Sequence, residues 1–336
     1  MKKTLLALLT VGAFLAFSAF SALAADPLIY VDFDEITPTT LNSGDTYPLD
    51  SYYERGTSVT AVFIESINGD GVVFGPATGD GINGPNSAGP QGGQVMFIDA
   101  GSPEKEEGLN WELSSYYPIM DFTVEVVFWL ATNNNSGNDH PSLGAIGIQN
   151  IWSSSWPTGS KLQMELRNIG NAALVGRPAD SQKLEVAAWQ PDGTEVRVVS
   201  TNIISAPAWH TCQVLFDYNE SDVANCSITM YLDGVLQGSV VYDATDATDV
   251  FDHSWAVFGT PVVGARSGFG NFRFQLGMSM SHLISGTDNR GLQGAIDAFA
   301  LSEGLLSPSQ FVLPGGFNPP PPPTPTAADP AWQVYR

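Results

Sequence analysis

The stretch "CSITMYLDGVLQGSVVYD", residues 226–243, decides how this chain folds. Alternate residues from Cys226 to Leu232 are apolar, as in a strand with one buried face. Asp233-Gly234 interrupts this run, and Asp-Gly is a strong signal for a two-residue hairpin turn. An acid inside an apolar run could also act in catalysis, but a general acid needs a cleft and a second carboxylate. The local sequence supplies neither, so we interpret Asp233 as a hairpin corner.

Short strands separated by Gly, Asn, Asp and Pro predict an all-β chain on both sides of this hairpin. No helical periodicity lasts beyond the N-terminal segment. The glycine-rich stretch 68–94 is predicted to be largely irregular. The clearest strands are "LIYVDFDEI" (28–36), "FTVEVVFWL" (122–130), "KLEVAAWQ" (183–190) with "EVRVV" (195–199) after a Pro-Asp-Gly turn, and "WHTCQVLFDY" (209–218).

The N-terminus predicts export. A basic start, an apolar run and "SALAA" are typical of a secretory signal peptide over residues 1–24, with cleavage after Ala24. The remaining chain has 11 basic and 35 acidic residues, a net charge of −24. Such a surface repels nucleic acid and anionic lipid and suits divalent cations. No apolar span follows residue 24, so we expect no membrane span in the exported protein.

The C-terminus predicts an extended end. Residues 25–313 form one folded domain in this interpretation, and residues 314–328, with five consecutive prolines, form a linker. The short tail 329–336, "DPAWQVYR", carries apolar aromatic residues on this linker. Two interpretations remain open: a tag that docks to a surface partner, or a frayed end without a role.

The order of several landmarks resembles the laminin-G-like domains of the concanavalin A-like jelly-roll superfamily, in their bacterial secreted form. A strand beginning Trp209-His210 precedes the Tyr-x-Asp-Gly type hairpin. The chain then closes with "GAIDAF" (294–299) and "LSPSQF" (306–311). The resemblance implies a two-sheet antiparallel jelly-roll sandwich. It also implies a binding or adhesion module, often for carbohydrate and sometimes assisted by calcium.

The resemblance implies a cation site where the first and closing strands lie side by side, which would engage Asp34 and Asp297. Oxygen ligands of this kind suit calcium. The alternative is that both carboxylates only cap backbone amides. The repeated aspartates of "DATDATDVFD" (243–252) lack the glycine of a calcium loop, and we interpret them as a solvated acidic loop.

Aromatic residues suggest where a sugar would bind. Trp152 and Trp156 lie in the serine-rich stretch "QNIWSSSWPTGS", where an indole can offer a flat face to a sugar ring. Asn133 and Asn135 in "ATNNNSGNDH" could add hydrogen bonds. The alternative is that the tryptophans fold back over the edge of the sheet.

The chain has two cysteines, Cys212 and Cys226. Each lies on the inward face of one of two neighbouring strands, so we expect a disulfide in an exported protein. Two buried thiols are the alternative, because the register could slip.

These observations predict an exported, non-catalytic module that binds carbohydrate outside the cell, at its surface or in the periplasm, with no catalytic residue assigned. The Glu-x-Asp-x-x-Glu pattern of glycosidases on this fold is absent from the sequence. Two alternatives stay open: a polysaccharide-degrading hydrolase or lyase on the same fold, and a structural envelope protein.

Overall fold

A computed structural model describes the fold of most of the strands and of the segments beside them. The described residues are 27, 29–34, 40–41, 46–48, 53–54, 60–65, 72–76, 89–98, 107–112, 117–118, 121–130, 142–148, 161–168, 182–189, 195–217, 221–242, 257–258, 272–277 and 294–313.

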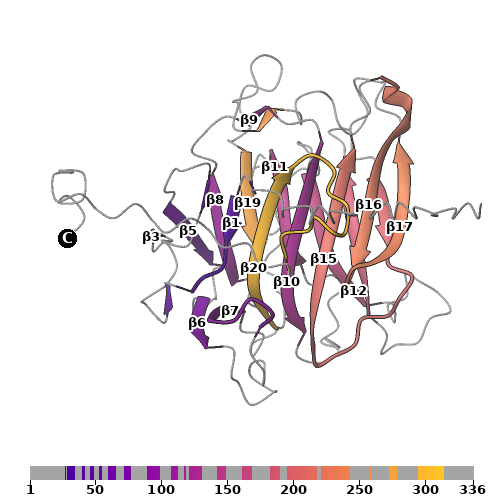
Figure 1. Ribbon diagram of the computed structural model, residues 1–336. Helices are drawn as coiled ribbons and strands as arrows, with labels where there is room; N and C mark the ends of the chain where they lie inside the picture. Colours follow the sequence, from indigo (N-terminus) through magenta and orange to yellow (C-terminus); the bar gives the residue numbers. More distant parts are fainter. Residues whose placement is uncertain are drawn as a thin grey trace, which may run out of the picture.

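The larger of two antiparallel sheets has ten strands (Figure 1). Its main path runs β17-β16-β15-β10-β20-β7-β6-β2, and β1 pairs with both β20 and β4. The strands are β1 (Ile29–Val31), β2 (Thr40–Leu41), β4 (Tyr53–Glu54), β6 (Val72–Pro76), β7 (Gln94–Ile98), β10 (Phe122–Leu130), β15 (Ala208–Asp217), β16 (Cys226–Leu232), β17 (Val235–Tyr242) and β20 (Gly294–Glu303).

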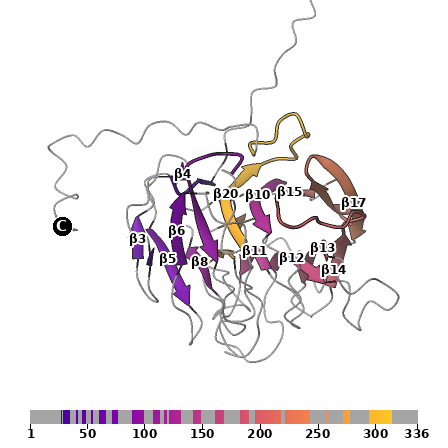
Figure 2. The ribbon, with the colours of Figure 1, turned by 90° about the horizontal axis from the view of Figure 1, so that it is seen from below.

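The second sheet has eight strands in the order β14-β13-β12-β11-β19-β8-β5-β3. Figure 2 shows the two sheets as stacked layers. The strands are β3 (Thr46–Pro48), β5 (Thr60–Glu65), β8 (Glu107–Glu112), β11 (Ser142–Ile148), β12 (Lys161–Asn168), β13 (Gln182–Trp189), β14 (Glu195–Val199) and β19 (Phe272–Leu276). A small separate pair joins β9 (Tyr117–Pro118) to β18 (Val257–Phe258).

This architecture confirms the predicted all-β antiparallel sandwich. Apart from one 3-10 turn, Val223–Asn225, the described residues contain no helix. The Asp233-Gly234 turn joins β16 to β17, with φ of 51° at Asp233 and 74° at Gly234. Positive φ at both central residues defines the type I′ hairpin, so the prediction of a corner at Asp233 is confirmed.

Strand β10 is buried along its whole length, on both faces. It lies between β15 and β20, and its sequence is rich in the β-branched and aromatic residues that suit a central strand. Phe122 stacks on Phe216 of β15, with ring centroids 4.7 Å apart. Val127, on the other face, belongs to an apolar cluster with Leu306 and Phe311.

The segment after β20, residues 305–313, covers this outer face of the ten-stranded sheet; we call it the closing segment. It lies on the side away from the eight-stranded sheet (Figure 2). Glu125 fixes it, because its buried carboxylate accepts hydrogen bonds from the amides of Val312 (2.8 Å) and Leu313 (2.9 Å). Gln213 donates to the Leu313 carbonyl at 3.0 Å.

The predicted disulfide is wrong. Cys212 and Cys226 are free, buried thiols. Cys212 stands opposite Leu232 in the β15–β16 ladder, and Cys226 stands opposite Tyr242 on β17. Because Cys226 and Leu232 lie at the two ends of β16, about 20 Å of strand separates Cys226 from the position beside Cys212. No disulfide can span that separation.

The predicted signal peptide, linker and tail (1–24, 314–328 and 329–336) lie outside the described residues. Within the part of the chain that the structure describes, no helix has the length and apolar character needed to cross a membrane.

Candidate functional site

The backbone register gathers polar and charged positions on one face of the eight-stranded sheet. Residues directly opposite each other in antiparallel strands share a face, as do alternate residues along a strand. The alternate positions Leu184, Val186 and Val198 are buried in the core. The opposite face, which we call the polar face, contains positions Asn110 and Glu112, Lys161, Gln163, Glu165 and Arg167, Lys183, Glu185, Ala187 and Trp189, Glu195 and Arg197, and Arg273 and Gln275.

Basic residues are distributed unequally between the two sheets. Five of the chain's 13 lysines and arginines occupy the polar face. The strands of the ten-stranded sheet contain no lysine or arginine. On the polar face, Arg197 forms an ion pair with the buried Glu185, with 3.3 Å between Nε and Oε1. The Lys183 ammonium donates to the Thr201 carbonyl at 3.0 Å.

A second polar group lies where β1 ends beside β20. Phe33 has φ of 66°, a backbone conformation that non-glycine residues rarely adopt. The strand therefore ends at Val31, and Asp34 turns toward the segment 89–94. Asp34 Oδ1 accepts from the Gln94 amide at 2.9 Å, and the Gln94 side chain donates to the Asp34 carbonyl at 3.0 Å.

Asp297 of β20 belongs to the same group and is fully buried. Its Oδ2 accepts from the Gln91 amide at 2.9 Å, whereas its Oδ1 has no hydrogen-bond partner. Burial raises the pKa of Asp297 to about 7; the Gln91 hydrogen bond opposes this rise, and the Asp34 and Asp32 carboxylates add to it. The cost of ionising Asp297 would fall if a cation were bound beside it.

Two glycines allow the backbone to come this close to the carboxylates. A Cβ atom at Gly89 would overlap the Asp297 carboxylate, and one at Gly93 would overlap that of Asp34. Within the described ranges, no three His, Cys, Asp or Glu side chains converge on one point. A cation held by Asp34 and Asp297 would therefore complete its shell with backbone oxygens or water, as calcium commonly does.

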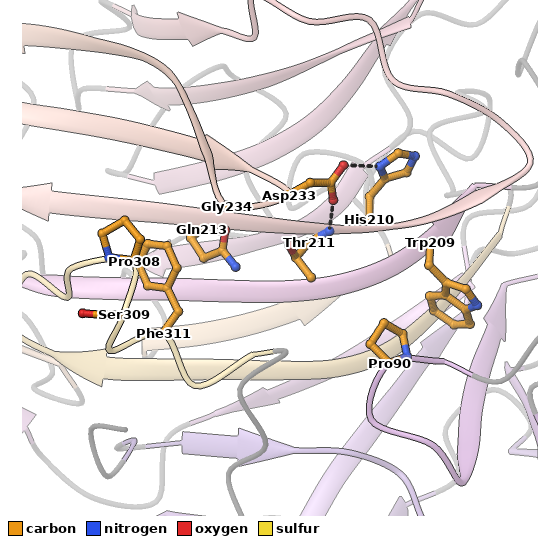
Figure 3. A pocket seen from close by; sticks show the side chains of 10 residues that line it. All are labelled: Pro90, Trp209, His210, Thr211, Gln213, Asp233, Gly234, Pro308, Ser309 and Phe311. Atoms are coloured by element: carbon orange, nitrogen blue, oxygen red, sulfur yellow. Dashed lines mark hydrogen bonds and ion pairs between the residues drawn. The ribbon is translucent and has the colours of Figure 1, made fainter. Parts of the chain in front are cut away.

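A third polar group lies at the β16–β17 hairpin. The Asp233 carboxylate accepts from His210 Nδ1 and from the Thr211 amide, both at 2.8 Å (Figure 3). His210 Nε2 lies 2.8 Å from the Ser205 carbonyl. Burial lowers the pKa of His210, but the hydrogen bonds to Asp233 and Ser205 more than compensate, and the pKa is raised.

A groove of about 490 Å³ opens beside this hairpin, on the outer face of the ten-stranded sheet (Figure 3). We call it the outer groove. Its floor comes from Trp209, Thr211 and Gln213 of β15, and the closing segment and Pro90 form its sides.

The predicted sites have different outcomes. The structure brings Asp34 and Asp297 into one carboxylate group, but calcium binding there stays a prediction. The predicted sugar-binding residues Trp152, Trp156, Asn133 and Asn135 lie outside the described residues.

Sequence reasoning missed the polar face and the His210–Asp233 pair. The alternation of charges in "KLQMELRN" and "KLEVAAWQ" was a usable signal for the first. The second joins residues 23 positions apart, and only the strand register brings them together.

Comparison with known proteins gives similarity at the level of the fold. No protein-family model matches the chain, and no curated protein matches it. Solved structures that resemble it include the mouse laminin alpha1 chain, domains LG4-5, at 14% identity and TM-score 0.37, covering 62% of this chain and 44% of that one. An alginate lyase matches at 10% identity and TM-score 0.37, covering 84% of this chain and all of that one. The endo-beta-1,4-glucuronan lyase of Trichoderma reesei matches at 12% identity and TM-score 0.38, covering 83% and 96%.

These similarities lie at the level of the fold and name no family for the chain, and one prediction needs correction. The sequence motifs predicted a chain that is not an enzyme. Polysaccharide lyases are among the structures of similar fold. The absence of a glycosidase motif therefore does not exclude catalysis, and the prediction that the chain is not an enzyme is wrong.

Proposed function

We propose that the protein is exported and binds an acidic polysaccharide on the polar face of its eight-stranded sheet. The observation that carries this proposal is the unequal distribution of basic residues: five lie on this one face, and none lies in the strands of the other sheet.

Electrostatics favours this face over the rest of the surface. The chain has a formal net charge of −22, so a chain of uronate residues is repelled by most of the protein. On the polar face, arginine and lysine positions interleave with acidic and amide positions. Arginine forms paired hydrogen bonds with carboxylates, which suits the carboxylate of a uronate. The aromatic position Trp189, opposite Lys161, adds a residue type that stacks against sugar rings.

Binding to immobilised polysaccharides tests this proposal. The exported chain is passed over alginate and polyglucuronate, and over neutral mannan and hydroxyethylcellulose. We expect binding to the two acidic polymers, and weaker binding as salt rises, because the contacts are between charges.

Two variants connect this binding to the polar face. Arg167→Gln combined with Arg273→Gln should weaken binding to alginate by about tenfold or more, which corresponds to ~1.4 kcal/mol. Lys105→Gln combined with Arg290→Gln removes the same number of positive charges at residues that are not among the polar-face positions, and serves as the control. Equal binding by the double variant and the control would reject the polar face.

A lyase is the second candidate, and one observation favours it. Glu165 stands on the polar face among its basic positions, opposite the buried Glu185, which is ion-paired with Arg197. In β-elimination a base removes the proton beside the uronate carboxylate, and a cation stabilises the resulting charge. The bond to the leaving sugar oxygen then breaks as a carbon–carbon double bond forms, and that oxygen takes up a proton from an acid or from water. Ultraviolet absorbance of the unsaturated product during incubation with alginate or polyglucuronate measures this activity directly.

We also propose that Asp34 and Asp297 hold a calcium ion that stabilises the fold. The buried, unpartnered Oδ1 of Asp297 and the carboxylate of Asp34 support this proposal. The ion would connect the first strand to the closing strand and favour the ionised form of both side chains.

A further inference from the structure

We infer that the outer groove is a second carbohydrate site, which binds a neutral, hydroxyl-rich pyranose. It lies on the opposite face of the sandwich from the polar face and has different chemistry. The residues that line it include Trp209, Phe311 and His210, and none is lysine or arginine. Its volume of about 490 Å³ lies within the ~300–1,000 Å³ of small-molecule pockets.

The floor of the groove contains an unused hydrogen-bond acceptor. Gln213 is 1% exposed, and its Oε1 has no hydrogen-bond partner. The orientation of the amide is determined by its nitrogen, which donates to the Leu313 carbonyl and hydrogen-bonds the Glu125 carboxylate. The amide oxygen therefore lacks a donor, and a buried acceptor without one destabilises the fold.

The rim of the groove supplies a second acceptor. Each oxygen of Asp233 already accepts one hydrogen bond, from His210 or from Thr211, which fixes the carboxylate in place. The Asp233 side chain is still 48% exposed, so each oxygen can accept a further donor from the groove. The groove thus has acceptors on its floor and at its rim.

These features together select the ligand. The groove has no lysine or arginine, and both ring nitrogens of its one histidine, His210, already bond Asp233 and the Ser205 carbonyl. It therefore has no free cationic donor for a carboxylate or phosphate group, and its acceptors favour hydroxyl donors. The partly exposed indole of Trp209 suits the apolar face of a sugar ring, and the buried Phe311 supports the groove from the closing segment. A neutral pyranose has both the hydroxyl donors and the apolar face.

The test uses full-length protein in which tryptophan is replaced by fluorotryptophan. The fluorine signal that is lost in Trp209→Phe identifies Trp209. Neutral disaccharides of glucose, galactose and mannose are then added at millimolar concentration. We expect the Trp209 signal to shift and saturate with at least one of them, and we expect galacturonate to leave it unchanged.

Ser309→Arg places a bulky side chain on the exposed side of the groove and should weaken this binding about tenfold or more. Val241→Arg, also exposed but not among the groove residues, is the matched control and should bind normally. Both variants should keep their thermal unfolding temperature and their retention on alginate, which separates this site from the polar face.

If the Trp209 signal shifts with none of the neutral sugars, or shifts equally in Ser309→Arg, the inference is wrong. If Ser309→Arg lowers thermal stability, saturation transfer to the neutral disaccharides is measured with Trp209→Phe instead: full transfer without the indole also rejects the site.

Discussion

The imidazole of His210 lies between two acceptors, with Nδ1 2.8 Å from Asp233 Oδ2 and Nε2 2.8 Å from the Ser205 carbonyl oxygen. Neither partner can donate a hydrogen bond. Both contacts are satisfied together only when each ring nitrogen carries a proton, so the native fold favours the imidazolium. The turn residue Asp233 is thus also the counter-ion of a strand residue.

This pair should make stability depend on pH. Since the pKa of His210 is raised in the folded state, its stabilising effect is complete below the unfolded pKa of about 6.5 and is lost as pH rises through the folded pKa. Asp233→Asn keeps a residue that tolerates positive φ but removes the charge. We expect it to cost about 1 kcal/mol near pH 6 and less near pH 8.5. Denaturant unfolding of both proteins at the two pH values measures this, and an equal loss at both would contradict it.

The stability that Asp297 contributes should change with pH in the opposite direction to that of a carboxylate in a surface salt bridge. Its pKa rises from about 4 in the unfolded chain to about 7 in the fold, so the native state binds the proton more tightly. Without calcium, its contribution to stability should therefore fall as pH rises from about 4 to about 7. Asp297→Asn should flatten this part of the profile of melting temperature against pH.

Calcium should reverse that loss. Adding calcium near pH 8 should raise the melting temperature of the natural chain, by mass action on the folded state. Asp297→Asn should remove this response, and Asp222→Asn, a change to an exposed aspartate elsewhere, should keep it. A response of equal size in Asp297→Asn would exclude this residue as a ligand.

The cysteines should behave as two buried thiols. We expect two thiols per chain to react with a thiol reagent after unfolding without reductant, and almost none to react in the native protein. Burial first, and then the charges of Asp233 and Glu125, raise the pKa of Cys212, which keeps it in the unreactive thiol form. If the unfolded, unreduced chain has no reactive thiols, the two cysteines form a disulfide after all.

The closing segment should be required for the fold, and the residues after it should not. Removing residues 315–336 should leave the melting temperature unchanged. Removing residues 305–336 uncovers the apolar cluster around Val127 and leaves Glu125 without its two amide donors, so unfolding should occur at much lower temperature. Cell fractionation of the shorter truncation also tests the docking tag, because loss of a surface anchor would release the protein.

The sequence predicted what depends on local pattern. The alternation in β16, the Asp-Gly corner and the apolar run of β10 each contain enough local information to identify a strand or a turn. The pairing of strands that are joined by longer connections could not be predicted from the local pattern. Cys212 and Cys226 were expected to be neighbours, yet the register places Leu232 beside Cys212.

The candidate sites depend even more on distant pairing. The basic positions of β12 and β19 show the right alternation individually, but their common face follows only from the ladder through β11. The outer groove joins Trp209 to Phe311, which no local pattern connects. Asp34 and Asp297 could be linked from the sequence because the first and closing strands resemble those of laminin-G-like domains, in which these strands lie side by side.

The position of β20 also has a consequence for how the chain is made. This strand is inserted between β10 and β7 and pairs with β1, where Val31 stands opposite Phe299. The ten-stranded sheet therefore cannot be completed until nearly the whole domain has been synthesised, and the contacts that complete it span most of the chain. A nascent chain that ends before residue 294 leaves β10 without one of its two neighbours and should show no cooperative unfolding. Late completion keeps the polypeptide extended for longer, which agrees with the export that we propose, because a translocation channel admits only an unfolded chain.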